Sequence, residues 1–230
     1  MGSSQNPKLS ILIATQGRRN PKFRILLKRL MQQVRKHKGE IEVVAYWNNG
    51  ELPIGKIRRA LVEESRGEYV CFIDDDDAVP DYYCKEILKA LGKDYVGFKV
   101  KLFNNGVEMP TAYHDLQYQV WTEDENGYYR GVTHLNPIRR PLAVLGDYDA
   151  MGAGEDAQWA KSVTTRVHDQ NYIDRIMYFY YHDKDDTSFG GTAVYKPTGY
   201  RRPKLTYKYF RWHPDSKETS KEVESEHNRV

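Results

Sequence analysis

The sequence has few cysteines, no long hydrophobic run and almost no excess charge, and each absence excludes a class of protein. Two cysteines in 230 residues cannot form a disulfide framework, and the settings of Cys71 and Cys84 predict buried thiols in a reducing compartment. No stretch reaches the roughly 18 apolar residues that span a bilayer. Residues 1–8 lack the apolar core of a secretion signal. We therefore expect a soluble, cytoplasmic protein with no transmembrane segment.

The charge balance also argues against a dedicated nucleic-acid-binding protein. The formal net charge of +3 is the difference between 35 basic and 32 acidic residues, whereas such proteins carry a clustered basic face. A hydrophobic content of 40% with 29% charged residues is typical of a soluble globular protein. The length fits one main domain.

Apolar strands alternate with amphipathic helices in the first hundred residues. The expected elements are a strand at 9–14, a helix with an apolar face from Phe23 to Val34, a strand at 41–47, a helix at 54–66 and a strand at 69–73. This βαβαβ order predicts an α/β fold with a mostly parallel sheet covered by helices. In such sheets ligands bind beyond the carboxyl ends of the strands.

The remainder of the chain has a weaker pattern. The sequence predicts, in order, a helix at 80–91, a strand at 95–103, a meander of short strands at 104–131, helices at 138–145 and 155–163, and a strand at 172–181. Residues 191–230 form a basic and aromatic extension, whose polar end from Ser216 onward we expect to fray. The meander predicts a smaller β region beside the main sheet.

An acidic run, Asp74 to Asp77, follows the third predicted strand directly. Adjacent carboxylates at a strand end repel one another, so their burial is costly unless a cation or hydrogen-bond donors compensate. Magnesium and manganese prefer oxygen ligands and are commonly held by one or two carboxylates together with substrate phosphates. The alternative is a solvated acidic turn before Pro80. An EF-hand is excluded, because Val79 and Lys85 occupy its glycine and glutamate positions.

Four segments resemble motifs of the family 2 glycosyltransferases, which have the GT-A fold, a Rossmann-like nucleotide-binding fold. FIDDDDAVPDYY (72–83) is similar to the Asp-X-Asp segment, and LSILIATQGR (9–18) to the first strand and nucleotide-binding turn. HLNPIRR (134–140) resembles an acceptor-side loop, and GED (154–156) an X-Glu-Asp motif that precedes a late histidine. The resemblance covers about 9–188. It implies a metal-dependent, inverting transfer of sugar from a nucleotide-sugar donor.

The resemblance also implies roles for individual residues. Asp76, His182 and Asp74 would bind Mn²⁺ or Mg²⁺. Asp156 would be the catalytic base, with Glu155 as the second candidate. The residues that would bind the donor nucleotide are Thr15, Gln16, Arg18, Asn48, Arg58, Asp74 and Asp75. Asn48 stands where many relatives have aspartate, which leaves the base open, although uridine is favoured.

Each role has a structural alternative. His182 would otherwise be a surface histidine, and Arg58 a surface cation. Glu155 and Asp156 would be ordinary first-turn acids, which stabilise a helix by roughly 0.3 to 1 kcal/mol.

The resemblance also implies a domain layout. A glycosyltransferase domain would span 1–190, with a donor half at about 8–103 and an acceptor half at about 104–190. The acceptor stays open among a glycan, a small molecule and a modified nucleic acid, and the sequence does not predict an oligomeric state.

Two other functions compete with this hypothesis. A nucleotidyltransferase also combines a βαβ site with acidic metal ligands, but ATQGRR (14–19) has one glycine where a phosphate loop has several. The cations and rings of 195–212 alternatively predict a module that binds nucleic acid or glycan.

Overall fold

The computed structural model describes residues 6–15, 21–48, 52–148, 154–182, 206–212 and 219–224, and the statements below concern these ranges. Gln16 and Arg18, which were predicted to bind the donor, lie outside them. No helix within these ranges is long and apolar enough to cross a membrane.

The first part of the chain follows the predicted alternation. Its elements are β1 (Leu9–Thr15), α1 (Pro21–Val34), β2 (Ile41–Trp47), α2 (Ile54–Glu64), β3 (Tyr69–Phe72), α3 (Tyr83–Ala90) and β4 (Tyr95–Asn104). β1 pairs in parallel with both β2 and β3, from Leu9 opposite Ile41 and from Leu9 opposite Tyr69. The predicted α/β class is therefore confirmed.

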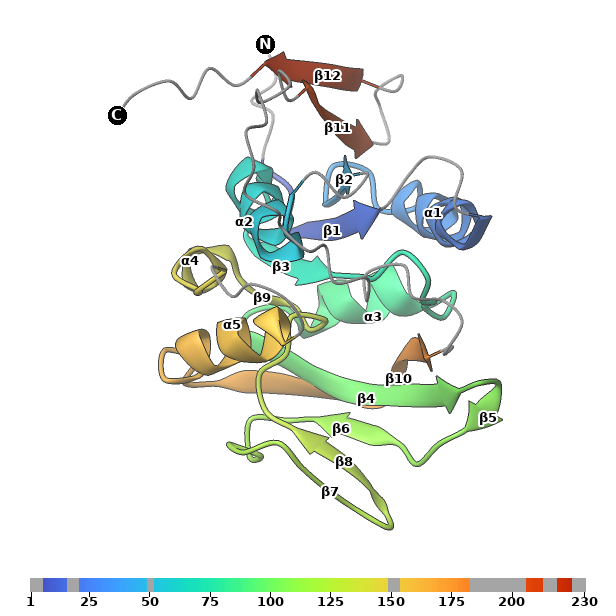
Figure 1. Ribbon diagram of the computed structural model, residues 1–230, viewed down its shortest axis with the longest axis vertical. Coiled ribbons are helices and arrows are strands. Elements are labelled where there is room, and N and C mark those ends of the chain that lie inside the picture. The colour runs from blue at the N-terminus through green and yellow to red at the C-terminus, as the bar shows by residue number, and fades with distance from the viewer. Residues whose placement is uncertain are drawn as a thin grey trace, which may run out of the picture.

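The second part begins with short strands and then returns to helices. Its elements are β5 (Val107–Glu108), β6 (Ala112–His114), β7 (Thr122–Asp124), β8 (Gly127–Arg130), β9 (Ile138–Arg139), α4 (Arg140–Val144), α5 (Glu155–Thr164), β10 (Gln170–His182), β11 (Thr206–Trp212) and β12 (Thr219–Glu224). The strands join one sheet in the order β12-β11-β2-β1-β3-β9-β4-β6-β8-β7, with β10 and β5 also pairing with β4 (Figure 1).

The two faces of the sheet carry two separate hydrophobic cores. Successive side chains of a strand point to opposite faces, so Ile11 and Ile13 belong to one core whereas Leu12 belongs to the other. Helices α1 and α3 cover the first face, and α2, α4 and α5 cover the second (Figure 1). The sheet is therefore buried on both sides where β1 to β3 run, which explains their nearly continuous apolar sequences.

Cys71 and Cys84 are buried free thiols of the first core, as predicted. Burial raises the pKa of both to about 12.

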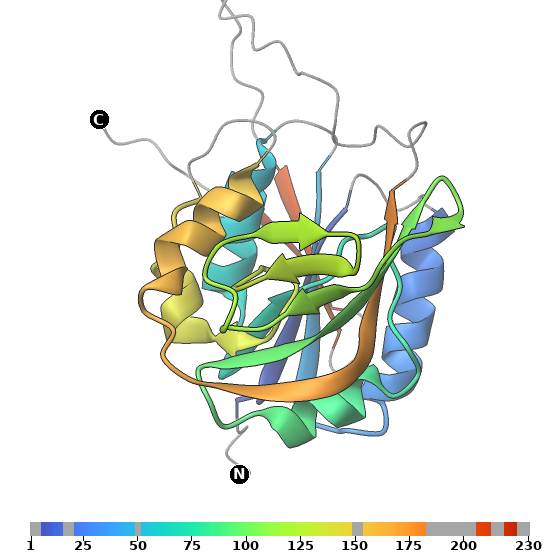
Figure 2. The ribbon, with the colours of Figure 1, turned by 90° about the horizontal axis from the view of Figure 1, so that it is seen from below.

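Strand β10 connects the smaller β region to the acidic run. It runs parallel to β4 and has register shifts at Ile176, and it is visibly bent in Figure 2. Beyond the bend, Phe179 pairs with Ala78, immediately after the acidic run. The bend therefore brings the end of β10 to the carboxyl end of β3.

Two predicted helices differ from those in the structure. The helix expected at 80–91 starts at Tyr83. The helix expected at 138–145 is divided, because Ile138 pairs with Val70 of β3 and Tyr95 of β4 before α4 begins.

The frayed end expected after Ser216 was wrong for 219–224. These residues form β12, which pairs with β11, and β11 in turn extends the central sheet beside β2.

Candidate active site

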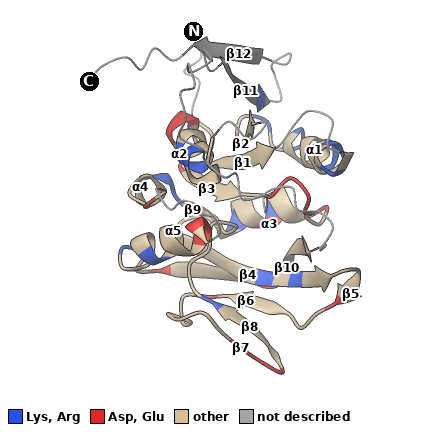
Figure 3. Cartoon of the chain, viewed as in Figure 1, with Lys and Arg blue, Asp and Glu red and all other residues tan. Residues whose placement is uncertain are grey.

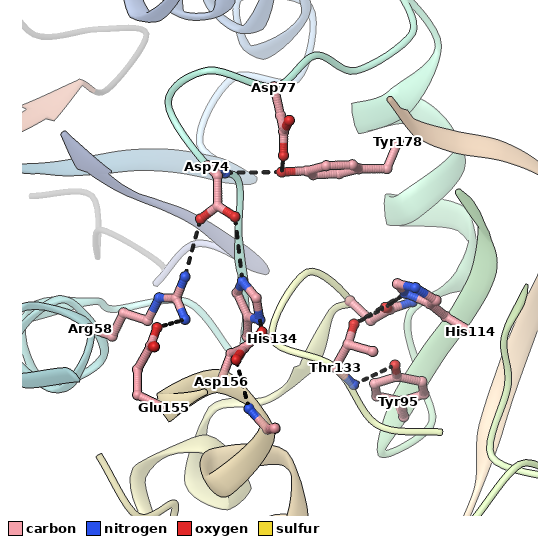
Figure 4. Close-up of polar contacts among 12 residues, drawn as sticks. Arg58, Asp74, Asp77, Tyr95, His114, Thr133, His134, Glu155, Asp156 and Tyr178 are labelled. Carbon is pink, nitrogen blue, oxygen red and sulfur yellow. Dashed lines mark hydrogen bonds and ion pairs between the residues drawn. The ribbon is translucent and has the colours of Figure 1, made fainter. Parts of the chain in front are cut away.

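Charged side chains from four separate elements meet at the carboxyl end of β3 (Figure 4). Arg58 comes from α2, Asp74 from the loop after β3, His134 from the loop before β9, and Glu155 and Asp156 from the first turn of α5. We call these five residues the charged cluster. Figure 3 shows acidic residues both in the loop after β3 and at the start of α5.

Arg58 holds two of the carboxylates together. Its Nη1 donates to Glu155 Oε1 at 2.6 Å and its Nη2 to Asp74 Oδ1 at 3.2 Å. Burial tends to lower the pKa of Arg58, but Asp74 and Glu155 outweigh it and raise the pKa. Burial likewise tends to raise the pKa of Asp74, whereas His134 and Arg58 lower it well below its usual range. Arg58 is thus a buried cation that links α2, the acidic run and α5.

Glu155 and Asp156 differ although they are neighbours. The Glu155 side chain is 11% exposed and is bound to Arg58, whereas the Asp156 side chain is 35% exposed. Asp156 Oδ1 accepts a bond from the N–H of Ala157 at 2.8 Å, which leaves Oδ2 free of the backbone. Gly154 precedes them with φ of 96°, a left-handed conformation that suits glycine. Of the two predicted bases, Asp156 is therefore the one with the more exposed carboxylate.

His134 lies between the two sides of the cluster. Its Nε2 is 3.7 Å from Asp74 Oδ2 and its Nδ1 is 3.8 Å from Asp156 Oδ2. Both nitrogens are buried and have no hydrogen bond among the described residues. The segment 134–140 resembles a family motif, but the resemblance implies no role for His134.

The four aspartates of the acidic run have different surroundings. Asp77 is buried, accepts a bond from the Tyr178 hydroxyl at 2.7 Å and another from the N–H of Tyr181 at 2.8 Å. The Tyr178 oxygen also accepts a bond from the N–H of Asp74 at 3.0 Å. Burial raises the pKa of Asp77 well above its usual value. Asp77 and Tyr178 thus attach the acidic run to β10, a role that the sequence did not reveal.

Asp75 and Asp76 lie between these anchored residues. Asp75 is 2% exposed. Burial, and then the charges of Asp74 and Asp75, raise the pKa of Asp76 to about 6. No group of three or more histidines, cysteines or acidic residues in the described ranges is arranged as a ready metal site. The aspartates therefore offer oxygen ligands, but the protein side chains alone do not form a closed cage.

The other predicted residues lie near the strand ends. Thr15 ends β1 and is buried, and its carbonyl accepts a bond from the N–H of Asn48 at 2.8 Å. The Asn48 amide bonds to both the carbonyl and the N–H of Leu52, at 3.0 and 3.2 Å. His182 ends β10 with its side chain exposed, one residue after the Tyr181 N–H that binds Asp77. Thr15 and Asn48 thus come from neighbouring strand ends, as a nucleotide site of this fold class requires.

A neutral network lies directly behind His134. We use this name for Tyr95, His114, Thr133 and Asn136. His114 Nδ1 is 2.6 Å from Asn136 Oδ1, which also accepts from Thr133 Oγ1 at 2.7 Å. The Thr133 N–H donates to the Tyr95 hydroxyl at 3.1 Å. Burial lowers the pKa of His114 to about 4, so this ring is neutral at pH 7.

Comparison with known proteins gives this arrangement a family. The model of glycosyl transferase family 2 matches residues 10–143, more than half of the 230 residues. The chain belongs to glycosyltransferase family 2. The matched segment includes Arg58, Asp74 and His134 of the charged cluster. A search of the curated proteins found no match.

Solved structures show that the fold of this family member is GT-A. Residues 1–349 of TarS from S. aureus have 17% sequence identity and a TM-score of 0.56, with 76% of this chain and 60% of that chain covered. The same TarS fragment in complex with UDP gives 17% identity, a TM-score of 0.54 and the same coverage. A longer TarS structure gives 17% identity and a TM-score of 0.55, covering 76% of this chain and 36% of that one. The chain therefore spans about 60% of the shorter TarS structures and about a third of the longer one.

Proposed function

We propose that this protein is an inverting glycosyltransferase that moves sugar from a uridine diphosphate sugar to an acceptor hydroxyl with the help of Mn²⁺ or Mg²⁺. The observation that carries the proposal is the charged cluster. It places a partly exposed carboxylate, Asp156, beside an acidic loop at the strand ends where nucleotides bind in this fold. Membership of family 2 and the UDP complex of TarS support the donor class.

The acidic run fits a divalent cation by the chemistry of its side chains. Asp74 and Asp76 supply the hard oxygen ligands that these cations prefer. Burial beside two other carboxylates opposes the charge of Asp76, so a bound cation would stabilise it. His182 would complete the set from β10. A cation bound there supplies Lewis-acid stabilisation of the departing diphosphate.

The protein's own residues would perform the remaining steps. Asp156 takes the proton of the acceptor hydroxyl as that oxygen attacks the anomeric carbon, and a carboxylate within hydrogen-bond reach suffices for this task. One base on the face opposite the leaving group gives inversion of configuration. Arg58 keeps Asp74 and the start of α5 in fixed relation, so that donor and base are held together.

The test is a panel of nucleotide-sugars, each incubated with the protein and either Mn²⁺, Mg²⁺ or chelator. We expect one uridine diphosphate sugar to release UDP, slowly to water and faster when acceptor hydroxyl compounds are added, and chelator to abolish the release. Release of pyrophosphate would instead indicate a nucleotidyltransferase. Binding of DNA that weakens with salt, without turnover of any donor, would contradict the proposal and favour a binding module.

A further inference from the structure

His134 is the member of the charged cluster for which the proposed reaction has no use, yet it is the least exposed of the five. The ring is 7% exposed and lies between the carboxylates of Asp74 and Asp156. A buried polar group without a hydrogen bond costs roughly 1 to 3 kcal/mol. A histidine that served only to pack would be expected to find a partner or be replaced by an apolar ring.

The gaps on either side of the ring are small. The distances of 3.7 and 3.8 Å exceed a normal N–H···O bond by less than about 1 Å. The two nitrogens point at different carboxylates, one on the donor side and one on the base (Figure 4). A small shift of Asp156, whose carboxylate is partly exposed, would close the Nδ1 contact. Catalytic hydrogen bonds are often long before substrate binds.

The backbone around His134 cannot move as easily. The carbonyl of His134 accepts a bond from the N–H of Phe72 at 3.0 Å, so its loop is attached to the end of β3. On the amino-terminal side, Thr133 is held by Tyr95 and Asn136 of the neutral network. Asn136 also donates to the carbonyl of Val96 at 2.8 Å. The loop is thus anchored to β3, β4 and β6, and the ring it presents is a fixed point in the site.

We propose, building on the function above, that His134 is a positioning residue that orients the Asp156 carboxylate against the donor side of the site. Asp156 Oδ1 is held by its own helix, and His134 holds Oδ2. Both oxygens are then fixed, while the second lone pair of Oδ2 stays available for the acceptor proton. A misplacement of about 1 Å in such a carboxylate can cost about a hundredfold in rate.

The test is a double-mutant cycle of His134 and Asp156, read by release of UDP to water from the preferred uridine diphosphate sugar. His134→Phe keeps a ring of similar shape without nitrogens, and His134→Gln keeps one donor. We expect His134→Phe to lower kcat about tenfold to a hundredfold with the KM for donor within about twofold, and His134→Gln to recover part of the loss. His168→Gln, at an exposed histidine before β10, is the matched control and should leave both constants unchanged.

The cycle separates positioning from mere folding. In the Asp156→Asn background, His134→Phe should cost less than about twofold, because the group that it orients is already disabled. Equal losses in both backgrounds, or wild-type kcat in His134→Phe, would overturn the proposal.

A crystal structure with donor bound gives a readout that does not depend on turnover. We expect Nδ1 within about 3.2 Å of Asp156 Oδ2, and a ring turned away from Asp156 would equally overturn the inference. A wild-type protein that neither binds nor hydrolyses any nucleotide-sugar would instead remove the proposed function itself.

Discussion

The charged cluster and the neutral network adjoin at His134 and Thr133, which are consecutive residues, but their polar groups are arranged in opposite ways. In the neutral network His114, Thr133 and Asn136 satisfy one another at distances of 2.6 to 3.1 Å. In the charged cluster Arg58 binds two of the three carboxylates, and neither nitrogen of His134 has a hydrogen bond among the described residues. Polar groups that are all hydrogen-bonded to one another stabilise a loop, whereas polar groups without a partner can still bind a ligand. We therefore expect the cluster to carry the chemistry and the network to support its loop.

The strongest way to break this comparison is to disable the cluster without unfolding the protein. We expect Asp156→Asn in the cluster, and separately Asp76→Ala in the adjoining acidic run, to reduce transfer at least about a hundredfold, the scale of general base catalysis. The melting temperature should stay close to that of the wild type, because the side chains of Asp76 and Asp156 are partly exposed and lie outside both hydrophobic cores. Steady-state UDP release and circular dichroism measure the two quantities. Near-normal turnover in both variants would remove the mechanism.

Glu155 is the matched neighbour and should behave differently. Glu155→Ala leaves the buried guanidinium of Arg58 with Asp74 as its one remaining carboxylate partner. Removing one member of a buried ion pair typically costs about 3 to 5 kcal/mol. Denaturant unfolding should therefore show a large loss of stability, in contrast to Asp156→Asn. If Glu155→Ala proves as stable as wild type but inactive, Glu155 rather than Asp156 would be the base.

The neutral network can be tested through the pH dependence of stability. His114 has a pKa of about 4 when folded against an ordinary value of 6.5. As the pH falls, His114 of the unfolded chain therefore binds a proton before His114 of the folded protein does. The stability that the neutral, buried ring contributes is complete above pH 6.5 and is lost between pH 6.5 and 4. The shift corresponds to about 3 kcal/mol.

The control for this pH dependence is a variant without the ring. His114→Asn should lose less stability than wild type between pH 7 and 4.5, as measured by urea unfolding at each pH. Identical slopes in the two proteins would show that folding does not lower the pKa of His114.

The smallest effect is expected at the contact between the acidic run and β10. Tyr178→Phe removes the hydroxyl that donates to Asp77 and accepts from the Asp74 N–H. Leaving a buried carboxylate oxygen without that bond should cost about 2 kcal/mol. Tyr82→Phe, which removes a hydroxyl bonded to the Ile176 carbonyl elsewhere on β10, is the control. If both variants lose the same stability, Asp77 is not specially dependent on Tyr178.

The sequence predicted the strands and helices of 9–73 because the spacing of their apolar residues is regular. In the structure these apolar residues lie in the two hydrophobic cores. It also predicted the acidic run, GED and Arg58 as site residues. It did not predict that Arg58 would pair with Glu155, 97 positions away. It placed His134 in a motif without a role, because nothing local distinguishes a histidine between two carboxylates from one on a surface.

Local sequence determined which residues could be charged, where the strands ended and which faces of the helices were apolar, since these depend on spacing along the chain. Only the tertiary structure decided which charges meet. The bend of β10, the pairing of β9 with both β3 and β4, and the entry of α5 beside α2 bring Asp77 to Tyr178, His134 to Asp74, and Glu155 to Arg58. Electrostatic interactions depend on distance through space and on burial, and neither quantity can be read from positions in a sequence.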